Sequence, residues 1–198
     1  MEKPANPDHP IHEILRRRWS PRAFSDRRIA PETLQSLFEA ARWAPSSANE
    51  QPWSFLVATK DDPEEYDRVL SCLVEGNQVW AKHAPALMVS VASKFDRDRD
   101  PNPHAWYDVG QAVADLSVQA TVLGLFVHQM AGILPDKIRE LYRIPDTHDP
   151  VTAIALGYPG TPDQLPDKLR QRESAPRTRK PIESFVFSGR WGQGFPLA

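Results

Sequence analysis

The sequence contains a single cysteine, Cys72, and only a small excess of charge, with a net charge of −2 over 198 residues. One cysteine excludes a disulfide within the chain and, with no signal-peptide pattern at the N-terminus, favours a reducing cytoplasm. The small net charge gives no electrostatic reason to expect nucleic acid or an anionic membrane as a partner. No apolar run approaches the length of a membrane span. We therefore expect an ordinary globular protein that binds neither.

Several motifs of catalysis and metal binding are also missing. The six histidines are scattered and form no H-E-x-x-H pattern, and there is no C-x-x-C pair, so we expect no metal site. A Walker A sequence and a G-x-S-x-G elbow are absent as well. We expect Cys72 to be a buried thiol in a helix rather than a nucleophile. His128 is expected to be a structural or ring-edge hydrogen-bonding residue.

Proline is abundant: its twenty residues are about twice the average usage. They cluster in residues 1–10 and 158–181, and both segments are expected to lie extended over the surface. The length fits one domain, residues 1–198, with an N-terminal arm over residues 1–10.

Hydrophobic periodicity predicts interleaved helices and strands, which indicates an α+β or α/β fold with a sheet between helices. A charged stretch with two prolines, residues 95–104, is expected to be a solvated loop. The helix that follows it is so widely apolar that we expect it to be buried, in part against another subunit. Expected helices are 10–18, 31–44, 63–74, 77–84, 105–123 and 135–142, and expected strands are 53–59, 86–92, 125–133 and 151–157.

Two polar blocks carry the chemical signal. Arg18, Ser20 and Arg22 follow the first helix, and such a cluster of arginines with a hydroxyl suits a phosphate dianion, although a solvated basic helix end is the plainer alternative. The second block, residues 45–51, offers backbone amides and short polar side chains to a flat heteroaromatic ring.

The spacing of the two blocks resembles the FMN-binding nitroreductase family. The first reads R-x-S-x-R-x-F over residues 18–24, and the second reads A-R-x-A-P-S-S-x-N-x-Q-P-W over residues 41–53. Further matches follow in the same order, and the resemblance covers roughly residues 11–188. It implies an α+β fold in which helices flank a central, mostly antiparallel or mixed sheet in a three-layer sandwich.

The resemblance also implies roles for individual residues. Arg18 and Ser20, with Trp19 between them, match the segment that holds the flavin phosphate or ribityl chain, and Arg22 matches a cation near the pyrimidine edge of the ring. Arg177 and Arg179 match a late basic pair that closes over the phosphate, and which of the two contacts it is left open. Asn77 matches a ligand of the ribityl chain or ring edge. The remaining matches are the strand end Gln129, Met130, Ala131 and Gly132 beside the ring, and Pro45, Ser46, Ser47, Asn49 and Gln51, whose loop reaches the flavin of the partner subunit.

Three positions depart from the family pattern. Trp19 replaces a second arginine or histidine, Trp80 replaces a lysine near the ring of some members, and Ala131 replaces a glutamate of others. These changes imply a flavin pocket that is more apolar than in the best-known members.

The function implied by the resemblance is that of an FMN-dependent oxidoreductase. It would take a hydride from NADH or NADPH and pass electrons to a nitroaromatic, a quinone or a similar planar aromatic acceptor, with no catalytic side chain of its own. We also expect an obligate homodimer, because residues 45–49 and the apolar helix 105–123 offer more binding and apolar surface than one small domain can use. In this dimer, residues 182–198 are expected to form a C-terminal arm that crosses onto the partner. The open alternatives are a dehydrogenase, dehalogenase or flavin-fragmenting synthase of the same fold, a non-catalytic flavin-binding protein, and a deazaflavin in place of FMN.

Overall fold

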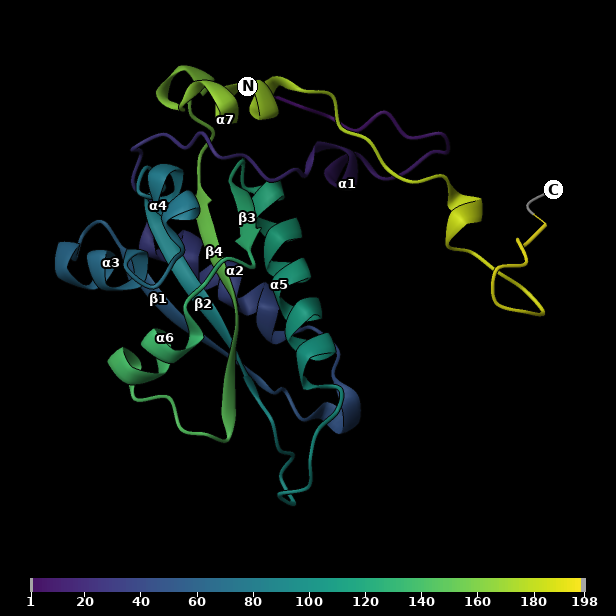
Figure 1. The fold of residues 1–198 in the computed structure, drawn as a ribbon, viewed down its shortest axis with the longest axis horizontal. Helices are drawn as coiled ribbons and strands as arrows, with labels where there is room; N and C mark the ends of the chain where they lie inside the picture. The colour runs from purple at the N-terminus through teal and green to yellow at the C-terminus, as the bar shows by residue number, and fades with distance from the viewer. Residues whose placement is uncertain (1, 197–198) are drawn as a thin grey trace.

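A four-stranded antiparallel sheet forms the middle layer of the computed structural model, which describes residues 2–196 (Figure 1). The strands are β1 (Trp53–Thr59), β2 (Ala86–Ser93), β3 (Phe126–Met130) and β4 (His148–Gly157), in the spatial order β1-β2-β4-β3. Every neighbouring pair runs antiparallel. This architecture confirms the expected α+β sandwich.

The central strand β2 is buried on both faces, which explains its unbroken apolar sequence. Because side chains alternate along a strand, Leu87 and Val89 pack into one helical layer and Met88 packs into the other. Each face of the sheet therefore has its own hydrophobic core.

One helical layer consists of α2 (Pro31–Arg42) and the long α5 (Ala105–Val122), which pack against each other and against the sheet. The inner side of α5 is fully buried, as expected from its apolar sequence. Its outer side leaves Trp106, Tyr107 and Val122 more than half exposed in the single chain.

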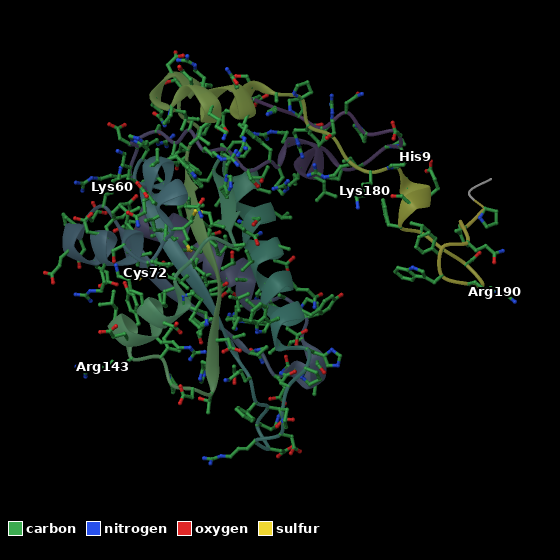
Figure 2. The ribbon with its side chains drawn as sticks, viewed as in Figure 1. His9, Lys60, Cys72, Arg143, Lys180 and Arg190 are labelled. Carbon is green, nitrogen blue, oxygen red and sulfur yellow. The ribbon has the colours of Figure 1, made fainter. Side chains whose placement is uncertain are left out.

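The other layer consists of α3 (Pro63–Leu70), α4 (Glu75–Ala81) and α6 (Pro135–Tyr142). The side chain of Asp62 caps α3 by accepting a hydrogen bond from the backbone N–H of Glu65 at 3.1 Å. Cys72 is fully buried in this layer, in the interior of the structure (Figure 2). It lies in the turn after α3 rather than in a helix as expected, and burial raises the pKa of its thiol.

The elements match the expected ranges with shifts at their ends. β1 and α6 have the predicted bounds, whereas the first helix, α1 (Glu13–Arg17), is shorter than predicted. β4 begins three residues before the predicted strand because His148, Asp149 and Pro150 pair with β2 beyond the apolar run.

The expectation that residues 158–181 lie extended was wrong. This segment contains the 3₁₀ helix η2 (Pro162–Gln164) and the α-helix α7 (Asp167–Ser174). α7 occupies a window without proline between Pro166 and Pro176. Its sequence is rich in good helix formers, and Leu169 and Glu173, four residues apart, face the body of the protein.

The N-terminal arm lies beside the segment that follows α7 (Figure 1). Residues 2–10 contain no helix or strand and run beside residues 175–180, which follow α7 (Figure 1). From the 3₁₀ helix η3 (Ile182–Ser184) onward, the C-terminal segment projects away from the body, and Arg190 lies far out on it (Figure 2). No helix in residues 2–196 is long and apolar enough to span a bilayer.

Candidate functional site

A cavity of about 190 Å³ opens beside the first predicted block. It brings together the N-terminal arm, the segment after α1 and the segment around the end of α7, so that six of its nine lining residues are cationic. The residues that line this arginine cavity are Lys3, Arg18, Trp19, Ser20, Arg22, Arg172, Glu173, Arg177 and Arg179.

The chain after α1 is extended, and a buried tryptophan anchors it. Arg18 ends α1 with ψ of 124°, which turns the backbone out of the helix. Trp19 is 5% exposed and meets the ring of Phe126 edge-on at 6.2 Å. Next to it, Arg18 Nη1 donates a hydrogen bond to Ser20 Oγ at 3.4 Å. The anchored tryptophan therefore holds the flanking arginine and serine at the cavity.

The arginine side chains of the cavity lie close to one another and are partly shielded from water. Burial lowers the pKa of Arg18 from its ordinary value, and the neighbouring Arg179 lowers it further. The pKa of Arg177 is lowered by burial and then by Arg18 and Arg179. Because a guanidinium stays protonated in proteins, these side chains form a concentrated positive charge that an anion would stabilise.

Glu173 at the end of α7 is the one acidic residue lining the cavity among the residues that the structure describes. Its side chain is 1% exposed, and Oε1 accepts hydrogen bonds from the backbone N–H groups of Arg22 and Ala23 at 2.7 and 3.0 Å. Its Oε2 is 3.9 Å from Arg22 Nη1 and accepts no hydrogen bond from residues 2–196. α7 thus fixes the backbone of the segment that carries Arg22.

His128 supports the same segment from the side of β3. Its Nδ1–H donates to the carbonyl of Pro21 at 2.8 Å, because a carbonyl oxygen only accepts. Burial lowers the pKa of His128 to about 4, and Arg22 and Arg18 act in the same direction. The imidazole is therefore neutral at pH 7.

Trp80 does not line the arginine cavity, although sequence analysis placed it near the flavin ring. It is 1% exposed and packs 4.5 Å from the ring of His128. The guanidinium of Arg22 lies 5.9 Å from its ring centroid. Trp80 therefore belongs to the core beneath Arg22.

The late basic pair divides into two environments. Arg177 Nη1 donates to the carbonyl oxygens of Lys3 and Arg16 at 2.9 and 3.1 Å, which ties the N-terminal arm to the end of α1. Arg179 donates to the carbonyl of its neighbour Thr178 at 2.7 Å and is exposed. Arg179 thus has more donors available to a ligand than Arg177.

A second group lies where β3 ends. Asn77 Nδ2 donates to the carbonyl of Gly132 at 3.1 Å, and a Cβ at Gly132 would lie 2.6 Å from the same nitrogen. Met130 is buried, whereas Gln129 and Ala131 are exposed. Asn77 and Gly132 thus lie in contact, and none of these residues lines the arginine cavity.

The second predicted block folds into a strained loop around the 3₁₀ helix η1 (Ser47–Asn49), and it includes the exposed Pro45. The φ angles of Ala48, Asn49 and Gln51 are 48°, 58° and 50°, in the left-handed region that costs non-glycine residues about 1 kcal/mol or more each.

Local hydrogen bonds hold this loop in place. The buried carboxylate of Asp108 accepts from the backbone N–H of Ser47 at 3.0 Å, and Ser46 Oγ accepts from the backbone N–H of Gln51 at 3.0 Å. The Gln51 amide in turn donates to Asn49 Oδ1 at 3.1 Å.

The loop and the arginine cavity lie near opposite ends of α5. Asp108, which holds the loop, is in the first turn of α5, whereas Phe126, which touches Trp19, follows the last turn. At 1.5 Å per residue, the helix between Asp108 and Val122 separates the two by roughly 20 Å. One chain alone therefore does not bring the two predicted blocks together.

Comparison with known proteins decides the family. The family model described as "Nitroreductase family" matches residues 15–158, which include both blocks and the whole sheet. The chain belongs to the nitroreductase family.

Its relatives within the nitroreductase family include proteins of similar length. A protein of Archaeoglobus fulgidus named "Putative NADH dehydrogenase/NAD(P)H nitroreductase" is 29% identical over 152 residues, covering 74% of this chain and 84% of its own. A solved oxidoreductase containing FMN is 36% identical with a TM-score of 0.89, covering 94% of this chain and 96% of its own. An FMN-dependent nitroreductase of Clostridium difficile is 27% identical with a TM-score of 0.65, covering 75% of this chain and 87% of its own.

Sequence reasoning missed three residues that line the cavity of this nitroreductase-family protein: Lys3, Arg172 and Glu173. Glu173 was missed together with α7, because residues 158–181 were expected to be extended; a helix in this segment would have placed Glu173 on the same face as Leu169. Nothing in the sequence indicated Lys3, since the extended arm that carries it has no periodicity.

Proposed function

We propose that the protein is an FMN-dependent oxidoreductase that takes electrons from NADH or NADPH and passes them to nitroaromatic compounds, quinones or similar planar acceptors. The observation that carries this proposal is the concentration of Arg18, Arg22, Arg177 and Arg179 around one cavity, together with Ser20. Membership of the nitroreductase family supports it, as do relatives whose names include FMN and NAD(P)H.

The donor set of the cavity fits the phosphate end of FMN. A phosphate monoester carries nearly two negative charges at neutral pH, and the arginines and Ser20 offer several N–H and O–H donors to it. Trp19 also lines the cavity, and its buried Nε1 has no acceptor among residues 2–196. The Oε2 atom of the Glu173 carboxylate accepts no hydrogen bond from residues 2–196 and lies near Arg22. Its negative charge repels an anion there, which favours a phosphate close to Arg18 and Arg179.

Once bound, FMN supplies the electron-transfer chemistry, and the side chains bind and orient it. Arg22 is assigned to the flavin ring, because its position in the family motif matches a cation near the pyrimidine edge; Glu173 fixes its backbone, and its guanidinium lies 5.9 Å from the ring centroid of Trp80. Asn77 is assigned to the ribityl chain or ring edge, and the strand end from Met130 to Gly132 is assigned to the side of the ring. None of these roles needs a nucleophile or a metal ion.

The proposed site is completed by a second copy of the chain in a homodimer. The loop of residues 45–51 lies roughly 20 Å from the arginine cavity of its own chain, so it is available to the cavity of a partner. The outer side of α5 exposes Trp106 and Tyr107, and the C-terminal arm exposes Trp191. These apolar surfaces are suited to an obligate interface of about 2,000 Å² or more.

The visible spectrum of the purified protein tests the proposal most directly. Blue-region absorption bands of bound FMN that bleach under anaerobic titration with NADH or NADPH, followed by turnover of a nitroaromatic or a quinone, are expected. Bound FMN that neither nicotinamide reduces would indicate another reaction of the same fold. A colourless protein that takes up no FMN contradicts the proposal.

We also propose a cytoplasmic location for the protein, with which its single cysteine agrees.

A further inference from the structure

We infer that Lys3, on the N-terminal arm, is an additional ligand of the flavin phosphate, and that Arg177 and Glu173 are positioning residues that hold the arm over the cavity. The inference rests on the proposed FMN site and adds a ligand that lies outside the matched family region of residues 15–158.

The position of Lys3 is the first observation. Its side chain lines the same cavity as Arg18, Ser20 and Arg179. The ammonium group is 5.2 Å from the ring centroid of Trp19, the residue that anchors the segment after α1. Its Nζ donates to the carbonyl oxygen of Glu173 at 2.6 Å, and because an ammonium has three donors, two remain for a ligand.

The charges around Lys3 favour an anion there. Burial lowers its pKa, Glu173 raises it, and the guanidinium groups of Arg177 and Arg22 lower it. Lys3 is thus a partly desolvated cation facing other cations, with one carboxylate nearby. A phosphate dianion in the cavity would reverse this balance, since it attracts every cation that lines the wall.

The backbone of the arm is fixed at two points. The carbonyl of Lys3 accepts from Arg177 at 2.9 Å. Ala5 exchanges two hydrogen bonds with Arg16, N–H to carbonyl at 2.8 Å and carbonyl from Nε at 3.3 Å. The arm therefore delivers Lys3 to the cavity in a defined position, and Arg177 Nη1 holds the arm there.

A purely structural role for Lys3 is the alternative. The carbonyl of Glu173 lies in the last turn of α7, where a lysine can cap the helix C-terminus and complement its dipole. A cap stabilises the fold and has no preference for a ligand with a phosphate. The two roles therefore separate when FMN is compared with riboflavin, which has the same ring and no phosphate.

The experiment measures the dissociation constants of FMN and riboflavin for the unmodified protein, Lys3→Gln, Lys3→Arg and Lys168→Gln. Lys168 is exposed on α7 and does not line the cavity, so its variant is a control for the loss of one positive charge. We expect Lys3→Gln to bind FMN roughly tenfold more weakly, the effect of losing one hydrogen bond to a charged group. Riboflavin binding should not change, Lys3→Arg should keep most of the preference for FMN, and Lys168→Gln should match the unmodified protein.

Two results would overturn the inference in different ways. If Lys3→Gln lowers the melting temperature but leaves the ratio of FMN to riboflavin affinity unchanged, Lys3 is only a helix cap, and the proposed function stands. If the unmodified protein binds neither flavin, or binds both equally, the phosphate site itself is refuted, and the proposed role of Lys3 fails with it.

Discussion

Arg18 and Arg179 come from distant parts of the sequence, yet the pKa of Arg18 is lowered by burial and then further by the charge of Arg179. Two cations held together in this way raise the energy of the protein without a ligand. An anion that binds between them removes that repulsion and adds hydrogen bonds. At the scale of single residues, the arginine cavity is therefore a site prepared for negative charge.

Replacing either arginine should weaken FMN binding. We expect Arg18→Ala and Arg179→Ala each to cost about 1.5 to 3 kcal/mol, the usual contribution of a hydrogen bond to a charged group. The double variant should lose less than the sum, because both side chains face one cavity. Fluorescence titration with FMN measures all three, with Arg170→Ala on the exposed side of α7 as the control. Equal losses for FMN and riboflavin would show that the arginines do not bind the phosphate.

His128 gives the protein a pH dependence of known sign. Its pKa is lowered from 6.5 to about 4 in the folded protein, so the unfolded chain binds more protons between these values. The free energy of unfolding should therefore fall as the pH drops from about 6.5 toward 4, by at most about 1.4 kcal/mol per pH unit from this group.

Urea denaturation of the flavin-free protein at pH 7 and pH 5 measures this effect. His128→Gln removes the titrating group and should flatten the pH dependence, whereas His9→Gln on the exposed N-terminal arm should leave it unchanged. An unaltered pH dependence in His128→Gln would assign the effect to other groups.

At the scale of elements, Asp108 connects α5 to the strained loop of residues 45–51. It is 2% exposed and accepts the backbone N–H of Ser47 at 3.0 Å. Asp108→Ala leaves that N–H without its acceptor and should destabilise the protein by about 1 to 3 kcal/mol. Asp108→Asn keeps an acceptor oxygen and should lose less. Urea denaturation measures the free energy of unfolding of both variants, and Asp115→Ala on the same helix is the control. Equal losses of stability in Asp108→Ala and Asp115→Ala would refute the anchoring role of Asp108.

The elements also show which features a sequence can predict. β1 and α6 were predicted with their bounds because each is a short, regular pattern flanked by clear breaks. α7 was missed because the prolines on both sides of it suggested an extended segment, although its eight residues are rich in good helix formers. The family motif placed Arg18 and Ser20 at the cavity, but it could not show that Arg177 bonds the backbone of Lys3, because that contact depends on how two distant extended segments meet.

At the scale of the whole molecule, the C-terminal arm is a segment that, over residues 182–196, does not pack against the body of its own chain (Figure 1). It projects from the body (Figure 1), and Trp191 is 93% exposed. Truncation after Pro181 should therefore spare the fold of the body but weaken dimerisation and FMN retention together. Sedimentation and the absorbance of bound flavin measure the two losses. A truncated chain that stays dimeric and keeps its FMN would show that the arm serves neither, and an unmodified chain that is a stable monomer with bound FMN would refute the dimer.

The separation of the loop and the arginine cavity along α5 has a consequence for dimers assembled from two different variant chains. In a symmetric dimer, a chain with a damaged cavity still lends an intact loop to its partner, and a chain with a damaged loop still keeps an intact cavity. Chains that carry Arg18→Ala and Arg179→Ala together, and chains with a disrupted 45–51 loop, should therefore complement each other when they are unfolded, mixed and refolded together. The activity is measured at an FMN concentration at which each kind of chain alone is inactive. Random pairing makes half of the dimers mixed, and each mixed dimer has one whole site, so about a quarter of the original activity should return.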